Sequence, residues 1–247
     1  MRPVPDLVLV FAGGDPPPRS VLAETPPPDY VIAADSGLDH AVRLGVAVDL
    51  LVGDLDSVSA DAIALAASIQ RHPADKDATD LAIALEAAAA LDPAKVVVVG
   101  GHGGRLDHLL ANAALLAAPE HARLDLVWLA GTARVYVIRD RAELNGRPGD
   151  LLTLLPYGGP ATGVTTSGLR WPLHRATLPP GTTRGVSNEF STSHPSVAVS
   201  SGVLLGVHLP GDGDEGQPQS QSQSQPQPQP QSQYQLQSQP PPVPAPG

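Results

Sequence analysis

Two aspartates directly follow an apolar run in the stretch LLVGDLDSV, residues 50–58. Asp54 and Asp56 lie two positions apart, so in an extended chain both carboxylates point to the same side. Like charges this close repel each other and lose hydration, and a hard cation such as Mg²⁺ would relieve that cost. The same spacing also fits two solvated loop residues that cap a helix beginning near Ser59. Both interpretations stay open on this stretch alone.

A second acidic pair lies in the stretch HPADKDATD, residues 72–80. Asp77 and Asp80 are spaced i and i+3 at the expected start of a helix, which places them on one face. Acidic side chains there would also interact favourably with the positive end of the helix dipole. Lys76, one of only two lysines in the chain, could contact a phosphate or be an ordinary surface lysine. Two acidic pairs in one half of the chain favour a site for a metal and phosphate.

A glycine-rich turn separates an apolar run from an expected helix in KVVVVGGHGGRLDHLLAN, residues 95–112. Its glycines let the backbone approach a phosphate chain, with amide groups and a helix start presenting positive potential. Arg105 adds a fixed guanidinium fork. Asp107 could bind a metal, orient a nucleophile or cap the helix, and His108 is assigned no role. The motifs GxxxxGK[ST], HExxH and GxSxG are absent, which argues against a P-loop, a zinc protease and a serine hydrolase.

The elements that must position these residues follow from hydrophobic patterning. Short runs rich in valine and leucine predict buried parallel strands, at residues 7–11, 31–33, 50–52, 95–99 and 124–128. The stretches between them predict helices, at residues 38–44, 59–69, 79–91 and 105–118, with Thr79 or Asp77 capping the third. This alternation predicts an open, mostly parallel α/β sheet with helices on both faces. After about residue 130, short runs separated by turn residues predict an all-β sandwich or barrel.

Ligands of open α/β sheets bind beyond the carboxyl ends of the strands. Four of the expected strands are followed there by glycine and aspartate, in the stretches AGGD (12–15), ADSG (34–37), GDLDS (53–57) and GGHGGRLDH (100–108). We therefore expect a single cleft at this edge of the sheet.

Composition divides the chain into an α/β domain (1–130), a β-rich domain (131–210) and a tail (211–247) of Gln, Pro and Ser that we expect to be disordered. A net charge of −10 with two lysines argues against a nucleic-acid partner. The chain has no cysteine, which excludes disulfides and thiolate sites. No apolar stretch approaches the ~20 residues of a membrane span, so we expect a soluble cytoplasmic protein without a membrane partner.

Six short motifs in order resemble the thiamine pyrophosphokinase family. They are DSG (35–37), GDLDS (53–57), KDATD (76–80), GGRLDH (103–108), GLRWPL (168–173) and VSNEF (186–190). The resemblance runs from about Leu7 to Val207 and implies diphosphate transfer from ATP to the hydroxyethyl group of thiamine, with Mg²⁺, giving AMP and thiamine diphosphate. It also implies an α/β catalytic domain followed by a β-rich domain, in a homodimer whose thiamine sites lie between subunits.

The resemblance implies roles for individual residues. Asp54 and Asp56 would hold Mg²⁺ on the ATP phosphates. Asp77, as a further metal ligand, and Asp80 would complete the acidic site or orient the attacking hydroxyl, and Asp107 joins the catalytic set. The expected contacts to ATP and its phosphates come from Gly13, Gly14, Asp35, Lys76, Gly103, Gly104 and Arg105. The expected thiamine contacts come from Trp171, Ser187 and Asn188, although a tryptophan in a β-domain core and an asparagine in a turn are also common.

Three other functions compete with this one. A related diphosphokinase acting on a pterin-type alcohol would use the same acidic pairs, but GLRWPL and VSNEF favour thiamine. A sugar nucleotidyltransferase would need a nucleotide-reading loop that the sequence lacks. A non-catalytic nucleotide- or thiamine-binding module would not require so much clustered acid.

Overall fold

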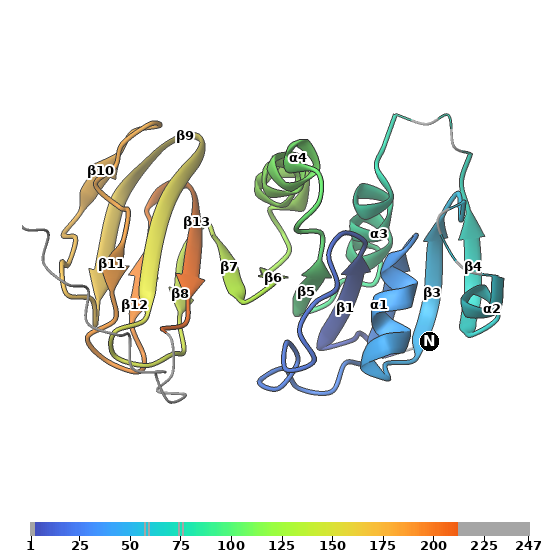
Figure 1. Cartoon of the computed structure of the whole chain (residues 1–247). Coiled ribbons are helices and arrows are strands. Elements are labelled where there is room, and N and C mark those ends of the chain that lie inside the picture. The colour runs from blue at the N-terminus through green and yellow to red at the C-terminus, as the bar shows by residue number, and fades with distance from the viewer. Residues whose placement is uncertain (1–2, 57, 59, 74, 76, 212–247) are drawn as a thin grey trace, which may run out of the picture. The chain divides into compact units, whose positions relative to one another are not determined.

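The computed structural model describes residues 3–56, 58, 60–73, 75 and 77–211 (Figure 1). Lys76 and all but the first residue of the expected tail therefore lie outside the described residues. None of the helices in the described part is long and apolar enough to cross a membrane.

The first half of the chain forms parallel strands in the order β4-β3-β2-β1-β5-β6. The strands are β1 (Leu7–Ala12), β2 (Tyr30–Ala34), β3 (Val48–Gly53), β4 (Ala66–Arg71), β5 (Lys95–Gly100) and β6 (Leu126–Ala130). The central strands β1 and β5 are almost completely buried, as expected for strands covered on both faces. The predicted open, mostly parallel sheet is thus confirmed.

Helices cover both faces of this sheet, as predicted. Leu38 of α1 (Gly37–Leu44) belongs to one apolar cluster with Leu9 and Phe11. Helices α3 (Asp80–Ala89) and α4 (Leu106–Ala117) contribute to the second cluster, with the alternate β1 residues Val8 and Val10. Thr79 caps α3 by accepting a hydrogen bond from the backbone N–H of Ala82 at 3.2 Å, as the sequence predicts. A short 3₁₀ helix, η1 (Pro119–His121), follows α4.

The predicted helix at residues 59–69 is wrong. Only α2 (Ala60–Ile63) is helical, and Ala66–Arg71 forms the edge strand β4, which pairs in parallel with β3. The residues of β4 are half-buried or exposed, so its side chains carry little of the alternation that marks a strand. Backbone pairing with β3 outweighs the helix propensity of its two alanines.

The second half is β-rich, as predicted, and continues the sheet in the order β6-β7-β13-β9-β12-β8. Its strands are β7 (Ala133–Ile138), β8 (Arg141–Glu143), β9 (Leu151–Ser167), β10 (Ala176–Leu178), β11 (Asn188–Glu189), β12 (Ser196–Ala198) and β13 (Ser201–Leu209). Strand β9 has 17 residues, and its glycines and prolines do not interrupt it. β6 pairs antiparallel with β7, so the ladder is unbroken where the sequence predicts a domain boundary, and that division stays a prediction.

Asp150 and His208 form a buried pair in the β-rich half. The Nε2 of His208 lies 2.8 Å from Oδ2 of Asp150, and the imidazole stacks on Phe190 with ring centroids 4.7 Å apart. Asp150 also accepts hydrogen bonds from the backbone N–H groups of Arg147 and Gly211, each at 2.8 Å. Burial alone would raise the pKa of Asp150, but these hydrogen bonds outweigh it and lower the pKa below its ordinary value.

We predict that Asp150→Asn lowers the free energy of unfolding by about 2 kcal/mol or more, because its amide cannot satisfy every donor that faces Asp150. In the wild-type protein the stabilisation by Asp150 is present above pH 3.8, the ordinary pKa, and is lost as pH falls through the lower folded-state value. Denaturant titrations across this pH range measure both effects. As a control, Asp125→Asn breaks an exposed contact to Lys95 at 3.8 Å and should change stability by under about 0.5 kcal/mol. Equal losses would contradict the role of the buried pair.

Gly100 ends β5 where the loops after β1 and β5 meet. Its φ is +89°, and a Cβ there would lie 2.4 Å from the carbonyl oxygen of Ala12. Gly45, after α1, also has a positive φ, +74°, but a Cβ there would meet nothing within 4 Å. The two positions therefore share backbone strain and differ in available space.

We predict that Gly45→Ala costs about 1 kcal/mol of folding stability from strain alone, and that Gly100→Ala costs about 1–3 kcal/mol more because of overpacking. Urea unfolding of the two variants measures the difference. If both substitutions cost the same, the loops after β1 and β5 are not as closely packed as described.

Candidate active site

The carboxyl ends of β3, β2, β1 and β5 lie side by side because these strands are adjacent and parallel. Backbone hydrogen bonds then join the loops that follow them. The N–H of Asp35 donates to the carbonyl of Val52 at 2.8 Å, and the N–H of Gly101 donates to the carbonyl of Gly13 at 2.7 Å. All four glycine- and aspartate-bearing stretches therefore meet at one edge of the sheet, as the sequence indicates.

Three carboxylates converge at this edge. Asp35, Asp54 and Asp56 each place an oxygen so that the three atoms lie within 4.8 Å of one another. Burial raises the pKa of Asp35, and the negative charges of Asp80, Asp54 and Asp56 add to that rise. These three residues, called the carboxylate cluster below, form a site of concentrated negative charge.

Asp54 and Asp56 do not lie in an extended chain, so the predicted geometry of this pair is wrong. Leu55 between them has a φ of +67°, and its side chain is buried in the core with only 6% exposed. The backbone N–H of Asp56 donates to Oδ1 of Asp54 at 3.2 Å. A tight turn with a buried leucine at its centre, rather than strand alternation, directs both carboxylates toward Asp35.

The two residues of the second acidic pair, Asp77 and Asp80, do not lie together on one helix face. Helix α3 begins at Asp80, so Asp77 precedes the helix and the predicted shared helical face is wrong. Asp80 lies against the end of β3, because a Cβ on Gly53 would be 3.1 Å from Oδ1 of Asp80 and 3.2 Å from Cβ of Asp35. Among the described residues, Asp77 is not in the group of three carboxylates.

The carboxylate cluster fits a hard divalent cation. Oδ1 of Asp35 is buried and has no hydrogen-bond partner among the described residues, which is costly for a carboxylate oxygen unless a ligand satisfies it. Asp35 also has a strained backbone, with a φ of +48°. Carboxylate oxygens are the ligands that Mg²⁺ prefers, usually with waters and phosphate oxygens in the remaining positions.

The glycine-rich turn after β5 lies next to the loop after β1. The N–H of Asp15 donates to the carbonyl of His102 at 2.7 Å, and a Cβ on Gly14 would lie 2.4 Å from that carbonyl oxygen. A Cβ on Gly103 would collide with the side chain of Asp15 at 1.9 Å. Gly104 has a φ of +58°, and a Cβ there would meet nothing within 4 Å. Gly14 and Gly103 allow this close approach of the two loops. Phosphate binding by the turn stays a prediction.

Arg105 and Asp107 interact with each other at the start of α4. Nε of Arg105 donates to Oδ1 of Asp107 at 3.1 Å, and a second bond joins Nη2 to Oδ2 at 2.5 Å. The hydrogen bonds from Arg105 lower the pKa of Asp107 to about 2. Both side chains are exposed, and Asp107 lies outside the carboxylate cluster.

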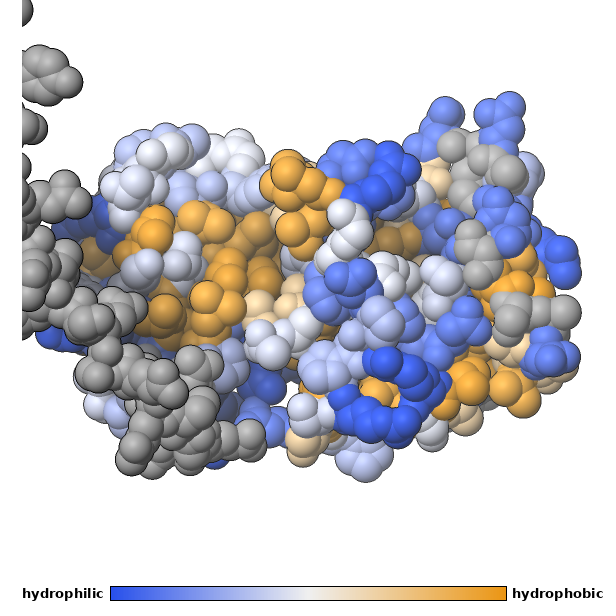
Figure 2. Space-filling view, viewed as in Figure 1, coloured by the Kyte–Doolittle hydropathy of each residue, from blue (hydrophilic) through white to orange (hydrophobic). Residues whose placement is uncertain are grey.

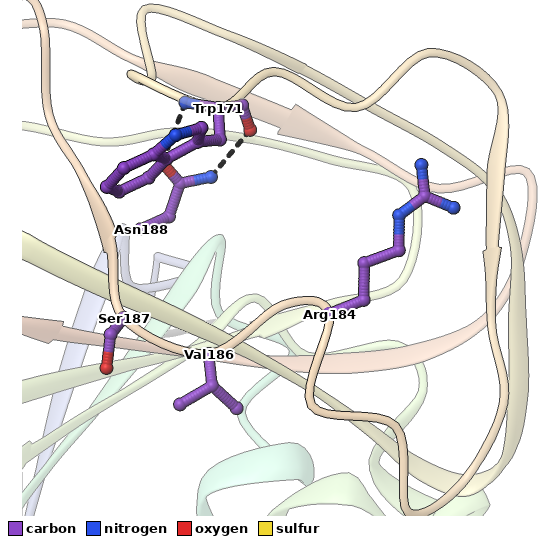
Figure 3. A pocket seen from close by; sticks show the side chains of 5 residues that line it. All are labelled: Trp171, Arg184, Val186, Ser187 and Asn188. Atoms are coloured by element: carbon purple, nitrogen blue, oxygen red, sulfur yellow. Dashed lines mark hydrogen bonds between the residues drawn. The ribbon is translucent and has the colours of Figure 1, made fainter.

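The β-rich half carries a pocket of about 280 Å³ (Figure 3). It is lined by Trp171, Arg184, Val186, Ser187 and Asn188. The three residues expected to contact thiamine therefore lie together, although Trp171 and Asn188 are separated by 17 positions in the chain. Two lining residues were not among the predicted contacts: Val186, the first residue of VSNEF, and Arg184, which precedes that motif by two positions.

Trp171 is an exposed pocket residue and not a core tryptophan, since 52% of it is accessible. Asn188 holds it in place. The backbone N–H of Trp171 donates to Oδ1 of Asn188 at 3.1 Å, and Nδ2 of Asn188 donates to the carbonyl of Trp171 at 2.7 Å (Figure 3). Asn188 is itself buried, so it acts chiefly on the position of the indole.

Ser187 has a φ of +54°, and its backbone N–H donates to Oγ1 of Thr153 at 3.0 Å. This bond fixes the chain directly before Asn188 against β9. The hydroxyl of Ser187 points away from Trp171 (Figure 3).

Family models for thiamin pyrophosphokinase match both halves of the chain. The family model for the thiamin pyrophosphokinase catalytic domain matches residues 26–128, and the model for its vitamin B1 binding domain matches residues 137–204. Together these two regions include most of the chain.

Individual relatives agree with the family models. A thiamine pyrophosphokinase of Bacillus subtilis is 25% identical over 180 residues, which is 70% of this chain and 84% of the relative. Thiamine pyrophosphokinase 1 of Oryza sativa is 27% identical over 163 residues, 60% of this chain and 61% of the relative.

Solved structures share the fold. A crystal structure of the Bacillus subtilis thiamine pyrophosphokinase superposes with a TM-score of 0.72 at 21% identity, covering 83% of this chain and 99% of that one. The yeast thiamin pyrophosphokinase superposes with a TM-score of 0.63 at 15% identity, covering 84% and 87%. On the ordered motifs, both family models and these relatives, the chain belongs to the thiamine pyrophosphokinase family.

Proposed function

We propose that this protein transfers a diphosphate group from ATP to the hydroxyl of thiamine, giving thiamine diphosphate and AMP. The convergence of Asp35, Asp54 and Asp56 at the carboxyl edge of the sheet carries the proposal. In this cluster the carboxylates would bind the metal ion of a metal–nucleotide complex, with phosphate oxygens in other positions of its coordination shell. Vitamin specificity is supported by the pocket around Trp171, within the region that matches the vitamin B1 binding domain.

In this reaction the thiamine hydroxyl oxygen bonds to the β-phosphorus of ATP. The bond from that phosphorus to the oxygen bridging the α-phosphorus breaks, and AMP leaves with the bridging oxygen. The hydroxyl proton passes to a carboxylate of the acidic site. Such transfers depend on positioning and charge neutralisation, with little covalent chemistry for the protein.

Residues at the carboxyl edge of the sheet would bind the metal ion and the phosphates. Asp35, Asp54 and Asp56 would hold Mg²⁺, which neutralises phosphate charge when it is bound. Gly13, Gly14 and the glycine-rich turn would bring backbone N–H groups to the phosphates. The other expected contacts stay predictions: those of Asp77, Asp80, Lys76, Gly103, Gly104, Arg105 and Asp107.

A homodimer in the cytoplasm is part of the same proposal. Apolar side chains are exposed on α4 and β9, where Leu106 is 66%, Leu110 59% and Leu151 38% accessible. Figure 2 shows such apolar surface around α4 and over the β-rich half. A second copy of the chain would remove this surface from water.

The test is an analysis of the products formed from ATP, Mg²⁺ and thiamine. We expect AMP and thiamine diphosphate in equal amounts, and Asp56→Asn should lower kcat by about 100-fold or more, because it removes charge from the metal site. Asp125→Asn, at an exposed position outside the site, is the matched control and should retain full turnover.

Circular dichroism of the Asp56→Asn protein should match the wild type, which separates a loss of chemistry from a loss of fold. Formation of ADP in place of AMP would overturn the proposal. So would turnover of a pterin alcohol under conditions in which thiamine gives no product.

A further inference from the structure

The pocket around Trp171 carries a positive charge, which does not suit a ligand that is only cationic. Arg184 is the charged side chain among its five lining residues, and none of the five is acidic. Among the described residues, Arg184 forms none of the ion pairs found. Thiamine, the proposed acceptor, carries a positive thiazolium ring, and a guanidinium beside it would repel that ring.

Arg170, which precedes Trp171 in the chain, adds no unbalanced positive charge to the pocket. Its guanidinium lies 4.7 Å from the centre of the Trp171 ring and pairs with Glu189 at 2.7 Å. Glu189 therefore balances the charge of Arg170, and Arg170 covers part of the indole. Among the described residues that line the pocket, Arg184 therefore carries the unbalanced charge.

The backbone that carries Arg184 is held on both sides. Its N–H donates to Oγ1 of Thr182 at 3.2 Å. The carbonyl of the next residue, Gly185, accepts from the N–H of Leu154 in β9 at 2.8 Å, and a Cβ on Gly185 would lie 2.4 Å from the carbonyl oxygen of Leu154. Arg184 thus extends from a fixed point of the pocket wall, across the opening from Trp171 (Figure 3).

An aromatic surface opposite a guanidinium suits a ligand that has both an aromatic ring and an anionic group. Guanidinium binds phosphate oxygens through two parallel hydrogen bonds, and indole stacks on heterocycles. We propose that Arg184 forms a phosphate-binding subsite, so that this pocket binds a phosphate ester of thiamine more tightly than thiamine itself. This inference rests on the proposed function, and it assigns Arg184 to retention of the phosphorylated product.

Isothermal titration calorimetry without nucleotide or magnesium tests the subsite separately from catalysis. The ligands are thiamine, thiamine monophosphate, thiamine diphosphate and AMP. We expect both esters to bind the wild-type protein about tenfold more tightly than thiamine, the typical contribution of a charge-assisted hydrogen bond.

Three variants locate the effect. Arg184→Gln should abolish the preference for the esters and leave thiamine affinity unchanged or higher, because it removes the repelling charge. Arg123→Gln, which alters an exposed arginine outside the pocket, should keep the preference. Trp171→Ala should weaken thiamine and both esters together.

Equal affinity of the wild-type protein for thiamine and its esters would overturn the inference. So would an Arg184→Gln protein that loses affinity for thiamine and for the esters to the same extent. A larger effect of that variant on AMP binding than on ester binding would also overturn it. If thiamine binds without any preference for its esters, this inference fails and the proposed function stands. If neither thiamine nor its esters bind the wild-type protein, the inference also fails, and the product analysis separately decides the proposed function.

Discussion

The parallel backbone ladder that joins β3, β2, β1 and β5 is the constraint on which the rest of the structure depends. Parallel pairing brings the carboxyl ends of strands separated by up to about 90 residues to one edge. Buried valines and leucines on both faces fix this pairing, because any slip in register would expose apolar surface or bury polar side chains. The acidic and glycine-rich loops meet only because that core is in register.

The site adds local strain to this framework. Asp35 and Leu55 both have left-handed backbone conformations, at φ values of +48° and +67°, which cost energy for residues with a side chain. The burial of Leu55 in the core helps offset that cost and holds the turn between Asp54 and Asp56. Three carboxylates are thereby held close together at the edge of a buried sheet, an arrangement that is unfavourable without a cation.

Much of this could be predicted from the sequence, because the strong signals were local. Valine runs such as residues 95–99 mark buried strands, and Thr79 marks the start of α3 by its capping chemistry. The strand at residues 66–71 could not be predicted, because its exposed edge position removes the hydrophobic alternation. The turn at Leu55 was also hidden, since a left-handed leucine is stabilised by tertiary packing and not by its own preference.

The same distinction applies to the site residues. Asp54 and Asp56 could be selected from spacing, but the position of Asp35 beside them depends on the register between β2 and β3. Arg184 lies in no chemical motif, and only the folded loop brings it opposite Trp171. Sequence spacing thus predicts which residue types do chemistry, whereas the pairing of strands and loops determines which of them act together.

We propose that carboxylates from two separate strand ends form a single cation site. Calorimetric titration of Mg²⁺ into the protein, with a non-hydrolysable ATP analogue present, tests it most directly when wild type and Asp35→Asn are compared. We expect saturable binding that is weakened by about tenfold or more in Asp35→Asn, with the fold unchanged by circular dichroism. Equal Mg²⁺ affinity in the two proteins would contradict it.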